Sequence, residues 1–153
     1  MSHSFYFVLY ASTIVFFSSC NVTKSNNSSN TGLFQGTVSF SEGNQMQSNK
    51  YTSVLGKGVQ REVHIYELTN VKDVEQIDNL YFSPKSKIVA IIVSNTRGEF
   101  KQSLPPGTYS VLIKEGDGYF ASFLDKENNL HPLQINTGET TTADILINYK
   151  VSY

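Results

Sequence analysis

Histidine, the commonest general base, and cysteine, a strong nucleophile, are both scarce in this sequence. The chain of 153 residues contains three histidines and one cysteine. Once the apolar N-terminal run is set aside, only His64 and His131 remain as general bases, and a nucleophile needs such a base within hydrogen-bond reach. No Gly-x-Ser-x-Gly elbow accompanies either histidine. The sequence predicts two ordinary histidines, because a hydrolase would require both to converge on one cleft.

Metal ligands in clusters are equally sparse in the sequence. Zinc sites use three or four clustered His, Cys or carboxylate ligands, and the two histidines are far apart without paired spacing. Calcium could be held by carboxylates flanking one hairpin of short loops, but these lack EF-hand spacing and its glycine. The carboxylates are those of Glu115, Asp117, Asp125 and Glu127. We expect solvated turn acids, and we expect neither a metal nor another cofactor.

Three aromatic side chains follow the Gly116-Asp117-Gly118 turn, namely Tyr119, Phe120 and Phe123. Aromatic faces could stack on sugar rings or pack against a protein partner. Alternation along a strand places Tyr119 and Phe123 on one face and Phe120 on the other, so at least one ring is expected in the core. Sandwich packing and a ligand-binding patch therefore both remain open, and the exposure of Tyr119 and Phe123 separates them.

The N-terminus reads as a targeting segment. Phe5–Phe17 is apolar and uncharged, yet shorter than the ~20 residues that a membrane-spanning helix needs. Small residues follow it, as in a signal peptide. Phe17-Ser18-Ser19-Cys20 resembles a bacterial lipobox, which implies that the Cys20 thiol carries a lipid and becomes the first residue after cleavage. The alternatives are an ordinary secretory signal with a chance cysteine, or a signal anchor.

A polar, low-complexity stretch, Asn21–Thr31, follows the cysteine and cannot bury enough apolar surface to fold. The positions directly after Cys20 lack the lysine-plus-acidic cluster associated with export to the cell surface. We therefore expect a lipid-anchored protein of the cell envelope, in the outer membrane and facing the periplasm. The predicted organisation is a signal peptide at 1–19, a disordered tether at 20–32 and one β-domain at 33–153.

Composition supports a single all-β domain. Basic and acidic residues nearly balance, at 12 and 13, and no basic stripe is visible, so nucleic acid is not expected as a partner. Tyrosine, phenylalanine and β-branched residues fill the apolar runs, which favours strands. The length suits one domain with a core that needs no disulfide.

Strand patterns are clearest over Gly98–Tyr119, where Pro105-Pro106-Gly107 separates two strands. In the second strand Tyr109, Val111 and Ile113 point to one face, and Ser110, Leu112 and Lys114 point to the other. Short strands between regular turn signals predict a β-sandwich. The further strands are expected at Leu33–Ser41, Gln60–Leu68, Lys87–Ser94, Tyr119–Leu124, Leu130–Asn136 and Thr140–Tyr149.

Three segments carry more specific expectations. Glu42–Gly58 is polar and is predicted to be a loop. Thr69–Ser83 is predicted to be either a short helix or a loop across a sheet edge, because Val71, Val74 and Ile77 recur at intervals of three. Lys87–Ser94 has an uninterrupted apolar centre and is predicted to be a strand covered on both faces.

These motifs also resemble a known family. The motifs are Gly36-Thr37-Val38, Gly98-Glu99-Phe100 and Leu104–Val111. Together they resemble the carboxypeptidase regulatory-like domain, and the resemblance extends over roughly Leu33 to Tyr149. The resemblance implies a seven-stranded prealbumin-like (transthyretin-like), Ig-like Greek-key β-sandwich. Such domains usually have no catalytic residues, so none is implied here.

The expected function is that of a non-catalytic, membrane-anchored envelope lipoprotein. Acylated Cys20 would bind membrane lipid, and the sandwich would serve as a structural or adaptor domain that docks on another envelope component. The alternative is a module that binds carbohydrate or another small ligand through the Tyr119–Phe123 loop.

Overall fold

The computed structural model describes residues 30–41, 43–44, 56–149 and 151–152 of the chain. Nearly all of this part is strand and turn, and the one helical element is a 3-10 turn, η2 (Val71–Asp73). The strands are β1 (Gly32–Phe40), β2 (Gly43–Asn44), β3 (Lys57–Gly58), β4 (Glu62–Glu67), β5 (Glu75–Ile77), β6 (Leu80–Phe82), β7 (Ile88–Val93), β8 (Glu99–Leu104), β9 (Gly107–Glu115), β10 (Gly118–Phe120), β11 (Pro132–Ile135), β12 (Thr140–Ile147) and β13 (Val151–Ser152).

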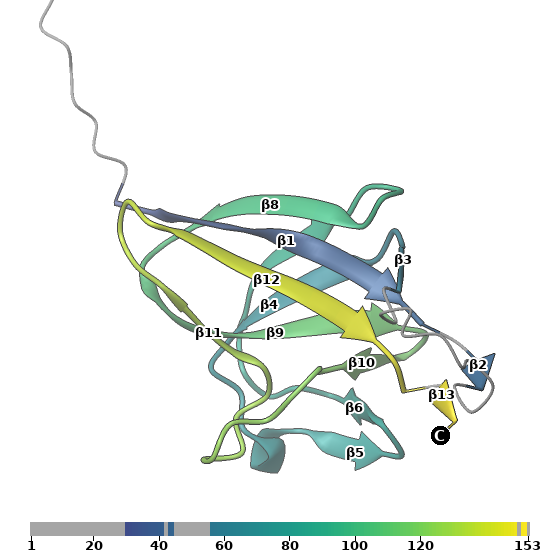
Figure 1. Ribbon diagram of the computed structural model, residues 1–153. Coiled ribbons are helices and arrows are strands. Elements are labelled where there is room, and N and C mark those ends of the chain that lie inside the picture. Colours follow the sequence, from purple (N-terminus) through teal and green to yellow (C-terminus); the bar gives the residue numbers. More distant parts are fainter. Residues whose placement is uncertain (1–29, 42, 45–55, 150, 153) are drawn as a thin grey trace, which may run out of the picture.

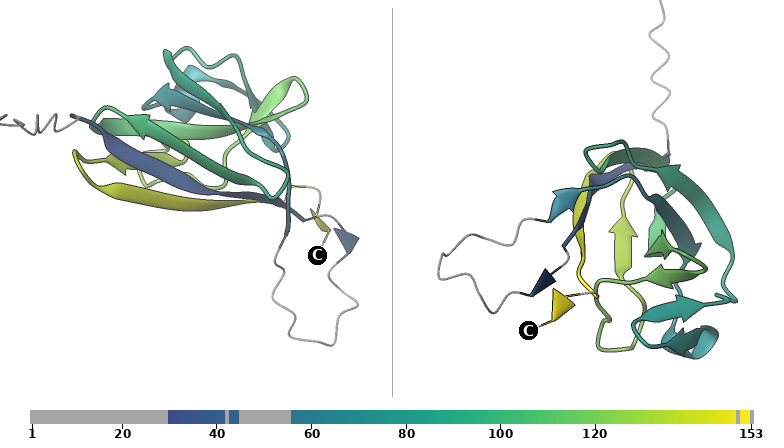
Figure 2. Two further views of the ribbon diagram at one scale, coloured as in Figure 1. Left: turned by 90° about the horizontal axis from the view of Figure 1, so that it is seen from above. Right: turned by 90° about the vertical axis from the view of Figure 1, so that its right-hand side faces the viewer.

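Two sheets pack face to face as a β-sandwich (Figures 1 and 2). In the first sheet β1 pairs in parallel with β12 on one side and in antiparallel fashion with β8 and β3 on the other. In the second sheet the order is β5-β6-β10-β9-β4-β7, and β11 pairs with the first half of β9. The predicted all-β sandwich is confirmed, and the strands beyond the expected seven are short.

The core lies between the sheets and follows the predicted alternation. Phe34 and Val38 of β1 are fully buried, and the Phe34 ring meets Phe100 of β8 edge-on at 5.0 Å between centroids. The remaining buried members come from both sheets, mainly from β4, β9, β11 and β12. Fully buried among them are Val63, Ile65, Val111, Ile113, Ile135 and Ile147.

A second, smaller cluster covers the outer face of the second sheet. It consists of Tyr66, Tyr81, Leu112 and Leu130, and we call it the outer cluster. Leu112 points outward from β9, as the alternation predicts, yet it is fully buried. Val71 and Val74 of the segment around η2 and Ala121 after β10 pack against this cluster, beside the β5–β6 hairpin that continues the sheet (Figure 1).

Three of the strand predictions need correction. Thr69–Ser83 contains a short 3-10 helix, η2, but the segment then continues into the β5–β6 hairpin, which was not expected. Lys87–Ser94 forms β7 as predicted, but it is not covered on both faces, since Ile91 is 55% and Val93 58% exposed. The aromatic strand is shorter than expected and ends at Phe120.

The segment predicted as a loop, Glu42–Gly58, contains two short strands. β2 pairs with β13, and β3 pairs with the end of β1. The rest of this segment, residues 42 and 45–55, lies outside the described residues.

Close approach of two backbones requires glycine at position 36. Gly36 is paired with Ala143 across the parallel β1–β12 ladder. A Cβ atom at this position would lie 1.9 Å from the carbonyl oxygen of Ala143 and 3.0 Å from the Phe100 ring. Any larger residue would therefore push the first strand of the sandwich away from the last.

Candidate functional site

β7 is the most unusual surface of the described structure, because its exposed side chains are apolar. Ile88, Val89, Ile91 and Val93 are between 37% and 58% exposed, whereas Ile92 is buried. The strand lies at the end of the second sheet, where its neighbour is β4. An apolar strand at a sheet edge is a template for pairing with another chain.

The other two long edge strands differ from β7 in chemistry. The exposed positions of β8 are Glu99, Lys101 and Ser103, and those of β12 include Thr142 and Asp144. Polar and charged side chains on an edge discourage pairing with further strands. The contrast within one molecule therefore singles out β7 as an edge without this protection.

Backbone hydrogen bonds show which peptide groups of β7 face outward. Ser94 N–H donates to the carbonyl of Arg61 at 2.9 Å, so the peptide groups of Ser94 point toward β4. Because the direction alternates along an antiparallel strand, those of Val93 and Ile91 point toward the open edge. A bulge opposite Ile65 and Tyr66 interrupts the ladder at the other end of β7.

Charged side chains flank both ends of β7. Lys87 directly precedes the strand and is exposed. Beyond the other end, Glu99 Oε2 accepts hydrogen bonds from Asn95 Nδ2 at 2.8 Å and from Arg97 Nη2 at 2.9 Å. These bonds from Asn95 and Arg97 lower the pKa of Glu99, which keeps this carboxylate ionised at neutral pH.

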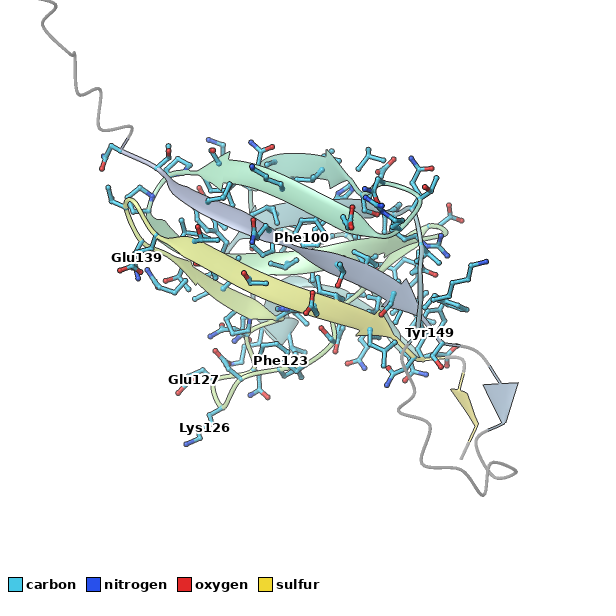
Figure 3. All side chains as sticks on the ribbon, turned by 45° about the horizontal axis from the view of Figure 1, so that its top comes forward. Phe100, Phe123, Lys126, Glu127, Glu139 and Tyr149 are labelled. Carbon is cyan, nitrogen blue, oxygen red and sulfur yellow. The ribbon has the colours of Figure 1, made fainter. Side chains whose placement is uncertain are left out.

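The predicted aromatic residues do not form one platform. Phe120 is 6% exposed and belongs to the main core, with its ring 5.9 Å from that of Tyr149. Phe123 is 49% exposed, and its ring lies 4.6 Å from that of His131. Figure 3 places Phe123 on the same loop as Lys126 and Glu127, outside the sandwich.

Tyr119 is half-buried and has neighbours of its own. Tyr66 Oη donates to Tyr119 Oη at 3.1 Å, and the His64 ring lies 5.1 Å from the Tyr119 ring. Lys114 Nζ sits 4.4 Å from the Tyr119 ring centroid, in a cation–π contact. Burial, together with the bond to Tyr119, raises the pKa of Tyr66. Tyr119 thus serves packing on this face, and stacking on a ligand stays a prediction for Phe123.

The two histidines have separate environments. His64 is 6% exposed, with Nε2 2.8 Å from Glu62 Oε2 and with Nδ1 lacking a hydrogen-bond partner among the described residues. His131 is 5% exposed, and its Nδ1 lies 2.7 Å from Ser122 Oγ. Burial lowers the pKa of His131 to about 4, so its ring is neutral at pH 7. No contact within the described ranges joins the two histidines.

Of the four carboxylates considered as calcium ligands, Glu115 and Asp125 have other partners. Glu115 is 7% exposed, forms an ion pair with Arg61 Nε and accepts a hydrogen bond from Tyr149 Oη at 3.1 Å. Asp125 accepts from the backbone N–H groups of Glu127 and Asn129 at 3.0 and 2.7 Å and closes its own turn. Within the part of the chain that the structure describes, no three His, Cys, Asp or Glu residues are grouped to hold a metal ion.

A shallow groove of about 840 Å³, lined by both polar and apolar side chains, lies beside the β7–β8 corner. Its walls include Gln35, Thr37, Lys101 and Asp144, and it reaches Val93. Asp144 Oδ1 accepts from both the backbone N–H and the hydroxyl of Thr37, at 3.1 and 2.5 Å. Two of the polar side chains in the groove therefore satisfy each other.

The predicted lipid-attachment residue, Cys20, and the apolar run Phe5–Phe17 lie outside the described residues. Among the residues that are described, no helix has the length and apolar character to cross a membrane.

Comparison with known proteins gives only distant similarities. No protein-family model and no curated protein matches the sequence. The alignment with the minor pilin GBS52 of Streptococcus agalactiae covers 76% of this chain and 43% of the pilin chain, at 14% sequence identity and a TM-score of 0.41. The alignment with a DUF3823 family protein from Parabacteroides merdae covers 76% of this chain and 45% of that protein's chain, at 17% sequence identity and a TM-score of 0.36. The chain spans less than half the length of each, and at these values neither assigns it to a family.

Proposed function

We propose that the chain is a non-catalytic, lipid-anchored protein of the cell envelope whose β-sandwich docks on another envelope component through β7. The observation that supports docking is the run of exposed apolar side chains on an open sheet edge, from Ile88 to Val93. Such side chains are stabilised when a further strand or face covers them, at roughly 25 cal/mol per Å² of apolar area.

The anchor in this proposal is Cys20. Its lipobox-like setting after Phe5–Phe17 supports acylation, and two acyl chains, each adding about 0.8 kcal/mol per buried CH₂, suffice for stable attachment. Asn21–Thr31 is the polar tether, and β1 begins directly after it at Gly32 (Figure 1). The membrane proposed is the outer membrane, with the domain facing the periplasm.

The family proposed for the domain is the carboxypeptidase regulatory-like family. Support comes from Gly36-Thr37-Val38, Gly98-Glu99-Phe100 and the Leu104–Val111 stretch, together with the β-sandwich fold. In this proposal the sandwich is a structural or adaptor module.

The test is photo-cross-linking in intact membranes, with the cross-linking amino acid at Ile91 of β7 and, as a matched control, at Lys101 of β8. Both positions are exposed on edge strands. We expect one abundant envelope protein from Ile91 and little from Lys101. Equal, scattered products from both positions would contradict docking through β7.

Lipid attachment is tested separately by the Cys20→Ala variant. Loss of acyl labelling and release from the membrane fraction are the expected results. A variant that stays in the membrane would show that Phe5–Phe17 is a signal anchor.

A second candidate is a module for carbohydrate or another small ligand, favoured by the 49% exposure of Phe123. Its ring offers one stacking surface beside His131. The Phe123→Ala variant should abolish glycan-array binding if this candidate holds, and the domain should remain folded because the side chain is outside the core.

A further inference from the structure

We propose that the groove beside the β7–β8 corner binds a neutral saccharide through polar side chains on the outer face of the first sheet. This function goes beyond docking through β7, and the site is separate from the Phe123 loop. The groove of about 840 Å³ adjoins a second hollow of about 350 Å³, because Thr37 and Asp144 line both. The volume of the larger one lies in the range of roughly 300–1,000 Å³ that is usual for small-ligand sites.

The strand register places six polar side chains of the groove in two rows, which we call the polar grid. The first row is Lys101, Gln35 and Thr142, and the second is Glu99, Thr37 and Asp144, each taken across β8, β1 and β12. All six point away from the core, because they alternate with inward-pointing residues such as Phe34 and Phe100. Neighbouring strands are about 4.8 Å apart, so side chains from more than one strand can reach a single sugar ring.

Bonds within the polar grid leave groups available for a ligand. Thr37 occupies only Oδ1 of Asp144, so Oδ2 can accept a further hydrogen bond. The side chains of Gln35, Lys101 and Thr142 have no hydrogen-bond partner within the described ranges. The polar grid therefore presents a carboxylate acceptor, an ammonium donor, and amide and hydroxyl groups that do both.

The charges of the polar grid favour an uncharged ligand. Glu99 is ion-paired with Arg97, so Asp144 and Lys101 are the charges of the grid that have no ion-pair partner in the part of the chain that the structure describes. Because they have opposite signs, an anion or a cation would be attracted by one of them and repelled by the other. A sugar hydroxyl donates and accepts at once and can use both groups.

The wall of the groove toward β7 is apolar. It is formed by Ile92, Val93 and Phe100, of which Val93 is 58% exposed. A sugar ring carries C–H groups on its faces and hydroxyl groups around its rim. The apolar wall and the polar grid therefore match the two parts of such a ring, and ligand sites commonly combine an apolar lining with a few polar groups that fix the orientation.

The test is saturation-transfer difference NMR on the full chain, in a mild detergent that has no sugar headgroup. The neutral probes are maltotriose and N-acetylglucosamine, and the comparison probes are galacturonate, an anion, and glycine, a zwitterion. We expect saturation transfer to at least one neutral sugar and no tighter binding of galacturonate or glycine. Tighter binding of either comparison probe would overturn the assignment of ligand class, and so would the absence of saturation transfer to both sugars up to their solubility limits.

Variants of exposed residues locate the site. Lys101→Met should raise the Kd of the bound sugar about tenfold, which is the loss expected for one hydrogen bond from a charged group. Lys126→Met, the matched control, removes the same charge from an exposed position of the 121–131 loop and should leave the Kd unchanged, as should Phe123→Ala. Equal Kd values for the two lysine variants would overturn the groove as the site. Loss of binding in Phe123→Ala would overturn it as well and would assign the sugar to the Phe123 loop.

Discussion

Removing the guanidinium of Arg61 should destabilise the sandwich more than its position at the surface suggests. Arg61 precedes β4, and its Nε forms an ion pair with Oε1 of Glu115, at the end of β9. The carboxylate is 7% exposed, and the arginine side chain is 34% exposed. Its other oxygen accepts a hydrogen bond from Tyr149 Oη at 3.1 Å. The carboxylate therefore depends on Arg61 for the compensation of its charge.

The magnitude follows from burial. Breaking a buried ion pair by removing one partner costs 3–5 kcal/mol, and the partial exposure of Arg61 places Arg61→Met at the lower end, about 3 kcal/mol. For a domain of this size such a loss corresponds to a fall in Tm of about 10 °C. Glu115→Gln should cost about 1–2 kcal/mol, because the arginine left behind can turn to water.

The assay is equilibrium unfolding in urea, followed by far-UV circular dichroism and tyrosine fluorescence, since the chain contains no tryptophan. The double variant Arg61→Met/Glu115→Leu removes both charges and should recover at least half of the loss caused by Arg61→Met. If Arg61→Met costs less than about 1 kcal/mol, the carboxylate is solvated and the argument from burial fails. If the double variant is no more stable than Arg61→Met, the loss arises from packing.

Three further predictions address other parts of the structure. Folding lowers the pKa of His131 from 6.5 to about 4. As the pH falls, the unfolded chain therefore takes up the proton at a higher pH than the folded chain, and about 3 kcal/mol of folding stability should be lost between pH 6.5 and pH 4. His131→Asn, which tolerates the positive φ of 35°, should flatten this pH profile, and an unchanged slope in pH-dependent urea titrations would refute the assignment. Gly36→Ala should separate β1 from β12 and lower Tm by well over 10 °C. The control variant, Gly107→Ala, should lower Tm little, because its Cβ atom would meet only the Tyr109 side chain, at 3.2 Å. Equal melting temperatures of the two variants would show that the β1–β12 ladder adjusts. His64→Phe keeps an aromatic ring beside Tyr119 and removes the unpaired Nδ1, so the free energy of unfolding should change by less than about 1 kcal/mol. A much larger loss would show that the hydrogen bond between His64 and Glu62 dominates.

Strands with one face against the core could be predicted from the sequence. In β9, Tyr109, Val111 and Ile113 alternate with polar or outward positions, and all three are buried between the sheets. The alternation determines the face because successive side chains of a strand point in opposite directions.

The apolar run of β7 shows where this reasoning fails. An uninterrupted run is compatible with burial on both faces, and the prediction of a covered strand followed from that pattern. The structure leaves Ile91 and Val93 exposed, because β7 ends the sheet and nothing in the described chain packs over these side chains. Sequence alone does not report which strand of a sheet is last.

The segment at 69–83 failed for a different reason. Val71 and Val74 pack on the outer cluster, whereas Ile77 is 57% exposed in the β5–β6 hairpin, so their regular spacing does not mark one helical face. The hairpin turns at Asp78 with a φ of 53°, without the glycine that would have predicted it. Similarly, β10 ends at Phe120, so alternation no longer determined the direction of Phe123.

The pairing of the first long strand with the last one constrains when the domain can fold. β1 lies between β8 and β12, and the hydrogen bond from Thr37 to Asp144 spans 107 positions of the chain. Contacts of such sequence separation form slowly and require the whole segment to be present. The first sheet therefore cannot close until β12 has left the ribosome. A chain that is to pass through a membrane unfolded would, by this topology, stay export-competent until β12 has been synthesised.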